Sequence, residues 1–145
     1  MGLKAVSGLA RMALKDLGCR DNAELSILLA DNAGIHRLNK RYRNKDKATD
    51  VLSFPMGDFN PKTRKGVMPY APTNPELILG DVVISVETAK AQAKKNGVAL
   101  NQEMTRLLIH GILHLLGFDH EKGCKEALKM KKEEERLLKI VKYKL

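Results

Sequence analysis

Two histidines four residues apart, followed by a glycine and a third histidine, constrain this chain more than any other feature of its sequence. The segment reads His110-Gly111-Ile112-Leu113-His114-Leu115-Leu116-Gly117-Phe118-Asp119-His120. Residues four apart on a helix are offset by only ~40° and one turn of rise, so His110 and His114 project side by side. Gly117 can adopt the left-handed conformation that ends a helix, which lets the chain turn back and brings His120 towards the same face.

Three imidazoles that converge on one point form a divalent metal site with one position left open. Zinc is the leading candidate, because a roughly tetrahedral set of nitrogen ligands suits it. A single histidine on an apolar helix is more often a hydrogen-bonded core residue, but three at this spacing would compete for few partners without a metal. We therefore expect one Zn²⁺ per chain, held by His110, His114 and His120, with the fourth position open to water.

The residue after the first histidine separates this pattern from that of the zinc metalloproteases. Their helix carries a glutamate there, which acts as general base on the water at the metal, whereas this chain has Gly111. Peptide hydrolysis by that mechanism therefore lacks its proton acceptor. A bound metal can still activate water towards another electrophile, because it lowers the pKa of that water to about 7.

Length and composition predict one compact domain over residues 1–145. The chain has 145 residues, within the typical ~100–200 residues of a domain, and 43% of them are hydrophobic and 30% charged. No apolar run approaches the ~18–20 residues of a membrane-spanning helix, and the first residues do not resemble a signal peptide. Two cysteines, Cys19 and Cys124, cannot build a disulfide framework. We expect a cytoplasmic protein without membrane association or a dinucleotide cofactor.

Helical and strand patterns alternate along the chain, which predicts an α/β or α+β layered domain. The expected elements are, in order, a helix over 3–17 ended by Gly18, a buried strand over 24–30, a helix capped by Asp31-Asn32, a strand over 51–54 stopped by Pro55, a long loop over 57–75, a strand over 77–84, a helix from Ser85 to Asn96-Gly97, a helix capped by Asn101 that runs to Gly117, and a charged helix over residues 122–141.

Three blocks of the sequence together resemble the YbeY family. They are residues 38–55, which read LNKRYRNKDKATDVLSFP, residues 79–85, which read LGDVVIS, and the histidine segment 110–120. The resemblance covers roughly residues 24–140. It implies an α/β layered domain with a small mixed sheet of three to four strands, about five helices, and the three histidines in a cleft. Members of this family are bacterial and organellar metal-dependent endoribonucleases implicated in ribosomal RNA maturation and ribosome quality control.

The resemblance also implies roles for individual residues. It assigns the metal ligands to His110, His114 and His120 and a functionally important arginine to Arg43, so we take Arg43 and His114 as the candidate catalytic residues. The chain departs from the family at its start. Family members begin with a strand, whereas this chain begins almost directly with a helix. The sequence therefore does not decide whether the sheet has this edge strand.

A basic segment surrounds Arg43. Residues 37–47 hold six Lys/Arg residues against Asp46 alone, a net charge of +5, in a chain whose net charge is +9. Such a segment is often only a solvated helix end, but it also suits phosphate binding that does not read sequence and that weakens in salt. The aromatic content of 4% argues against a base-stacking platform. We expect ribosomal RNA and the small ribosomal subunit as partners.

Four other residues are of types that can bind a metal or support a metal site. Cys124 could be a fourth ligand, although a closed four-ligand site would be structural, and a half-buried cysteine on the last helix is favoured. Asp119 orients a ligand or caps a turn. Cys19 is expected to pack in the core, and His36 is expected on the surface.

The function that the sequence favours is a single-strand-specific, zinc-dependent endoribonuclease that acts in ribosomal RNA processing, maturation and ribosome quality control. Two other classes stay open. One is a zinc metalloprotease-like hydrolase with a different base, against which Gly111 argues. The other is a non-catalytic ribosome-biogenesis factor whose metal only supports the fold.

Overall fold

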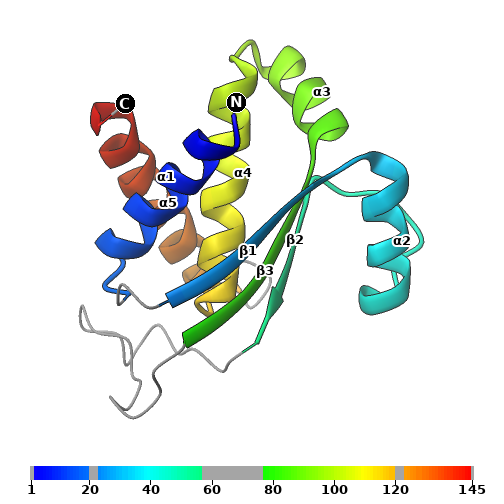
Figure 1. Cartoon of the computed structure of the whole chain (residues 1–145), viewed down its shortest axis with the longest axis horizontal. Coiled ribbons are helices and arrows are strands. Elements are labelled where there is room, and N and C mark those ends of the chain that lie inside the picture. The colour runs from blue at the N-terminus through cyan, green and yellow to red at the C-terminus, as the bar shows by residue number, and fades with distance from the viewer. Residues whose placement is uncertain (1, 20–22, 57–76, 120–122, 145) are drawn as a thin grey trace.

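The computed structural model describes residues 2–19, 23–56, 77–119 and 123–144 (Figure 1). Within these ranges it has five helices and a three-stranded mixed sheet, which confirms the predicted layered α+β fold. The helices are α1 (Leu3–Asp16), α2 (Asn32–Arg43), α3 (Val86–Asn96), α4 (Leu100–Leu115) and α5 (Cys124–Lys144), and the strands are β1 (Ala23–Ala30), β2 (Val51–Pro55) and β3 (Leu77–Ser85). No helix among these residues combines the length and apolar character needed to cross a bilayer.

The central strand of the sheet is β3, in the order β1-β3-β2. It pairs parallel with β1, where Ala30 lies opposite Ser85, and antiparallel with β2, where Val51 lies opposite Ile84. The strands β1 and β2 are therefore the edges of the described sheet. The prediction of a buried strand over 24–30 is wrong in its burial, because residues along β1 alternate in exposure and Leu28 is 54% exposed.

The helices cover the two faces of the sheet unequally (Figure 1). The helices α1, α4 and α5 lie on one side of the sheet, and α2 lies on the other. Successive strand residues point to opposite faces, so Val82 of β3 belongs to the large core under α4, while Val83 packs with Ile35 and Leu52 in a smaller cluster under α2. The helix α4 is thus the buried element that joins the sheet to α1 and α5, and Cys19 lies in the same core, as predicted.

The ends of the helices follow the predicted capping residues with one exception. The Asp31 carboxylate accepts a hydrogen bond from the Gly34 N–H at 2.7 Å, and the Ser85 hydroxyl accepts one from the Thr88 N–H at 3.2 Å. The prediction that Asn101 caps α4 is wrong, because the helix already begins at Leu100. The cap residue there is Ala99, whose N–H donates to Gln102 Oε1 at 3.0 Å.

Two predictions reach beyond the described residues. The long loop expected over 57–75 lies outside them, and so does His120. The last helix is described from Cys124 to Lys144, against the predicted 122–141, and its residues Met130, Leu137 and Val141 are buried.

Candidate active site

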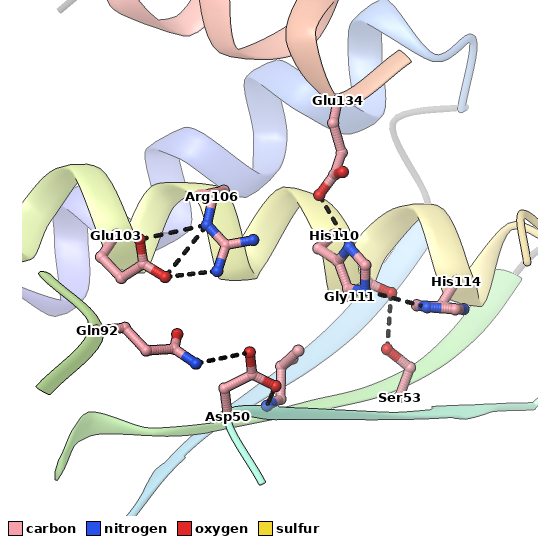
Figure 2. Close-up of polar contacts among 10 residues, drawn as sticks. Asp50, Ser53, Gln92, Glu103, Arg106, His110, Gly111, His114 and Glu134 are labelled. Atoms are coloured by element: carbon pink, nitrogen blue, oxygen red, sulfur yellow. Dashed lines mark hydrogen bonds and ion pairs between the residues drawn. The ribbon is translucent and has the colours of Figure 1, made fainter. Parts of the chain in front are cut away.

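His110 and His114 lie side by side on α4, as their spacing predicted (Figure 2). Their Nε2 atoms are 3.2 Å apart, and the ring planes meet at 72°. Two nitrogen ligands bound at ~2.0–2.1 Å to one tetrahedral metal would lie about 3.3 Å apart. The observed separation therefore fits two ligands of a shared metal ion.

A turn at Gly117 ends α4 directly after the histidine pair. The Gly117 N–H donates to the His114 carbonyl at 3.1 Å, and the Phe118 N–H donates to the Leu113 carbonyl at 3.0 Å. Together with the positive φ of 93° at Gly117, these bonds form a Schellman motif. The turn that the sequence predicted is thus confirmed, and it redirects the chain just before His120.

The third predicted ligand lies outside the described residues, so the three-histidine set stays a prediction. Among the residues that the structure does describe, no three His, Cys, Asp or Glu side chains are grouped to hold a metal ion. Asp119 lines the cleft described below. The prediction of a half-buried Cys124 is wrong, because this residue is exposed at the start of α5. A role for it as a ligand is untested.

Gly111 allows α4 to pack closely on the sheet. A Cβ atom added at this position would lie 2.6 Å from Val82 Cγ1 and 3.2 Å from Val51 Cγ2. The Ser53 hydroxyl of β2 donates a hydrogen bond to the Gly111 carbonyl at 2.8 Å (Figure 2). Position 111 therefore faces the sheet, and a glutamate side chain has no room there. The absence of the metalloprotease base thus has a packing reason as well as a chemical consequence.

A cleft of about 380 Å³ lies beside the histidine pair. It is bounded by α4, by β2, by the end of α2 and by the segment that follows α2. Three cationic residues line it together with the two histidines: Arg43, Lys45 and Lys47. The structure thus places the predicted arginine and two of the predicted ligands on one cleft.

Arg43 is the last residue of α2. Asn44 ends the helix in the left-handed conformation, with φ 56°, and the N–H of the following residue, Lys45, donates to the Asn39 carbonyl at 3.2 Å. Asparagine tolerates this conformation better than most residues do, because its short polar side chain can hydrogen-bond locally. The Arg43 guanidinium makes a long 3.5 Å contact from Nη1 to the Ser53 carbonyl of β2. This contact sets the guanidinium against the strand that forms one wall of the cleft.

Asn39 is a site residue that the sequence reasoning missed. It is only 2% exposed, and its Nδ2 donates to the Lys47 carbonyl at 2.9 Å. The backbone carbonyl of Asn39 accepts a hydrogen bond from the Lys45 N–H at 3.2 Å. One buried asparagine therefore holds the segment that carries both lysines. The available signal was a polar residue four positions after Ile35, where the apolar stripe of α2 calls for another apolar residue.

Glu134 is the second missed residue. Its Oε1 lies 2.8 Å from His110 Nδ1 (Figure 2). In the sequence it is the middle of three consecutive glutamates on a charged helix, and nothing local distinguishes it from the other two. Only the packing of α5 on α4 selects it.

His36 lies on α2, with its side chain 43% exposed, in agreement with the prediction of a surface histidine. Its Nε2 is 2.6 Å from Asp46 Oδ1, the single acidic residue of the basic segment. This hydrogen bond, helped by the charge of Lys40, holds the pKa of the Asp46 carboxyl below its usual value.

Comparisons with known proteins match the chain almost from end to end. The model of the family described as Endoribonuclease YbeY matches residues 3–142. The chain is 47% identical over 129 residues to Endoribonuclease YbeY of Aquifex aeolicus, and this match covers 89% of this chain and 77% of that protein. It is 54% identical over 115 residues to Endoribonuclease YbeY of Myxococcus xanthus, and this match covers 79% of this chain and only 35% of that protein.

A solved structure agrees with the fold. The solution structure of a Thermotoga maritima protein superposes with a TM-score of 0.65 at 23% identity, and the match covers 97% of this chain and 83% of that one. At this identity the likeness shows the fold alone. The extent of the family match and the identity to the Aquifex aeolicus relative show that the chain belongs to the YbeY endoribonuclease family.

Proposed function

We propose that the protein is a metal-dependent endoribonuclease whose active site is the cleft between α4, β2 and the end of α2. One observation carries this proposal: a histidine pair spaced for a metal lines the same cleft as three cationic side chains. Cleavage of a phosphodiester needs both kinds of group, because the phosphate must be held while the attack on it is activated. The names of the relatives, Endoribonuclease YbeY, support the same reaction class.

Zinc is the metal that we propose, with His110, His114 and His120 as its ligands. The donor set supports zinc, since neutral imidazole nitrogens suit this ion and the two described Nε2 atoms are spaced for it. When bound, zinc would supply Lewis-acid polarisation of the phosphate and activation of water at neutral pH. His114 thus enters the proposed catalytic set as a ligand.

Arg43 is the residue that we propose to stabilise the reacting phosphate. A guanidinium can hold two phosphate oxygens at once through its planar fork. Its place on the cleft wall would put that positive charge where negative charge grows as the phosphorus atom gains a fifth oxygen. Lys45 and Lys47 would hold neighbouring phosphates of the same strand.

The substrate that we propose is single-stranded ribosomal RNA, with the small ribosomal subunit as the partner and the cytoplasm as the setting. The preference for a single strand is what the family resemblance implies, and the cleft of about 380 Å³ is the surface on which that strand would bind. Cationic side chains on backbone phosphates position a strand without reading its sequence. The net charge of +9 suits a ribosomal target.

The experiment that tests this proposal compares three substrates: end-labelled single-stranded RNA, the matched RNA duplex, and casein. Zinc-loaded wild-type protein should cut the single strand, cut the duplex more slowly, and leave casein intact. Removing zinc with a chelator should stop cleavage, adding zinc back should restore it, and His114→Ala should stay inactive in both states. Casein degradation would favour a protease, and zinc-loaded folded protein that never cuts RNA would favour a non-catalytic ribosome-binding factor.

A further inference from the structure

A carboxylate from α5 contacts one of the two described histidines that we propose as metal ligands. Glu134 Oε1 lies 2.8 Å from His110 Nδ1 (Figure 2). The other ring nitrogen of His110, Nε2, faces His114. The side chains of Glu134 and His110 are only 17% and 21% exposed. The contact therefore lies largely out of water, where a hydrogen bond that involves a carboxylate is stronger than on the surface.

The packing of α5 holds Glu134 in this place. Met130 lies one helical turn before it and Leu137 one turn after it, and these two residues are 1% and 0% exposed. Residues three and four apart share one face of a helix, so Glu134 projects from the face of α5 that is fixed in the core. Its neighbours in sequence are placed differently. Glu133 forms an ion pair with Arg136, and Glu135 is exposed.

The chemistry of this contact determines which nitrogen of His110 can bind a metal. A neutral imidazole has one N–H and one lone pair, and an ionised carboxylate can only accept hydrogen bonds. With Glu134 ionised and the His110 ring neutral, this contact requires the proton on Nδ1, where it donates to Glu134, and leaves the lone pair on Nε2. That Nε2 atom is the one that lies 3.2 Å from His114 Nε2.

We propose that Glu134 is a positioning residue of the metal site, which fixes the tautomer and the ring orientation of His110 so that Nε2 is presented to the metal. This inference rests on the proposed function, because it takes His110 as a metal ligand. Carboxylates that accept from the second nitrogen of a ligating histidine also raise its basicity, and their loss typically costs ~10–100-fold in metal affinity.

Zinc affinity, measured by competition with a chromophoric chelator, tests the proposal without any RNA. Glu134→Ala should bind zinc about 10–100-fold more weakly than wild type. Glu134→Gln should lie between the two, since its amide oxygen still accepts the N–H bond but carries no charge. The matched control is Glu135→Ala, one residue along the same helix and exposed, which should bind zinc like wild type. Circular dichroism melts of the zinc-free proteins check that each variant is folded.

A second measurement reads the tautomer directly. Nitrogen-15 correlation spectra of the imidazole rings in the zinc-free protein should show His110 protonated on Nδ1 in wild type and a mixture of tautomers in Glu134→Ala. Zinc affinity of Glu134→Ala within twofold of wild type overturns the proposal, and so does a His110 tautomer that this substitution leaves unchanged.

The two proposals fail in different ways. If His110→Ala binds zinc as tightly as wild type, the metal site itself is wrong. If His110→Ala loses zinc while Glu134→Ala behaves as wild type, the metal site stands and only the role of Glu134 is refuted.

Discussion

Gly111→Ala should destabilise the protein, although alanine is the better helix former. The new Cβ would lie 2.6 Å from Val82 Cγ1, 3.2 Å from Val51 Cγ2 and 3.3 Å from Ser53 Oγ. Val82 is fully buried and β-branched, so it has little freedom to rotate away. Overpacking of this kind costs about 1–3 kcal/mol, and a contact of 2.6 Å belongs at the upper end of that range.

The helix propensity of alanine offsets about 1 kcal/mol of this cost. We therefore expect a net loss of roughly 1–2 kcal/mol in the free energy of unfolding, which lowers Tm by about 2–8 °C at this chain length. Thermal unfolding of the zinc-free protein measures it. Gly8→Ala is the matched control, because Gly8 also lies within a helix and a Cβ there would meet nothing within 4 Å. That control should gain roughly 0.5–1 kcal/mol.

A double-mutant cycle locates the cause of the loss. In a Val82→Ala background the nearest clashing atom is gone, so Gly111→Ala should cost less there than in wild type. If Gly111→Ala instead raises Tm as Gly8→Ala does, α4 does not lie this close to the sheet. The packing reason for the missing glutamate would then be refuted.

Three further predictions concern the cleft and the basic segment. Arg43→Ala should keep its fold and its zinc yet lose about 10²–10³ in RNA cleavage rate, with only partial rescue by Arg43→Lys, and cleavage at the wild-type rate would exclude a catalytic role. Lys47→Ala should weaken binding of single-stranded RNA and reduce the steepness of its salt dependence by about 0.7 in the log–log slope, whereas an unchanged slope would place Lys47 off the RNA path. His36→Ala should raise the pKa of Asp46 towards its usual value, since the hydrogen bond from His36 is the main cause of its lowering. Because the pKa of Asp46 is lowered in the folded protein, the contact stabilises the fold at pH values above the pKa of the unfolded chain. This stabilisation is lost as the pH falls through the pKa of the folded protein. An NMR titration in which the Asp46 carboxyl of His36→Ala has the wild-type pKa would contradict this.

Local chemistry explains which features the sequence predicted well. The caps at Asp31 and Ser85 and the turn at Gly117 depend on side chains and backbone within a few residues, so their patterns are visible in the chain itself. The side-by-side placement of His110 and His114 is of the same kind, because helix geometry alone dictates it.

Features that depend on distant neighbours were not predictable in this way. The exposure of Leu28 follows from the edge position of β1, which only the strand order reveals. The contact of Glu134 with His110 spans 24 positions and requires α5 to pack on α4. Asn39 stands where the apolar stripe of α2 calls for an apolar residue, but its role follows only from its bond to the Lys47 carbonyl, eight positions further along the chain. The three-histidine ligand set stays a prediction, since His120 lies outside the described residues.

The metal content of the purified protein tests the central claim most directly. Elemental analysis of wild type should find close to one equivalent of zinc or another transition metal per chain. Each single substitution of His110, His114 or His120 by alanine should lower that content, and the triple variant should carry none. Full stoichiometry in a folded triple variant would contradict the account, because the metal would then be held elsewhere.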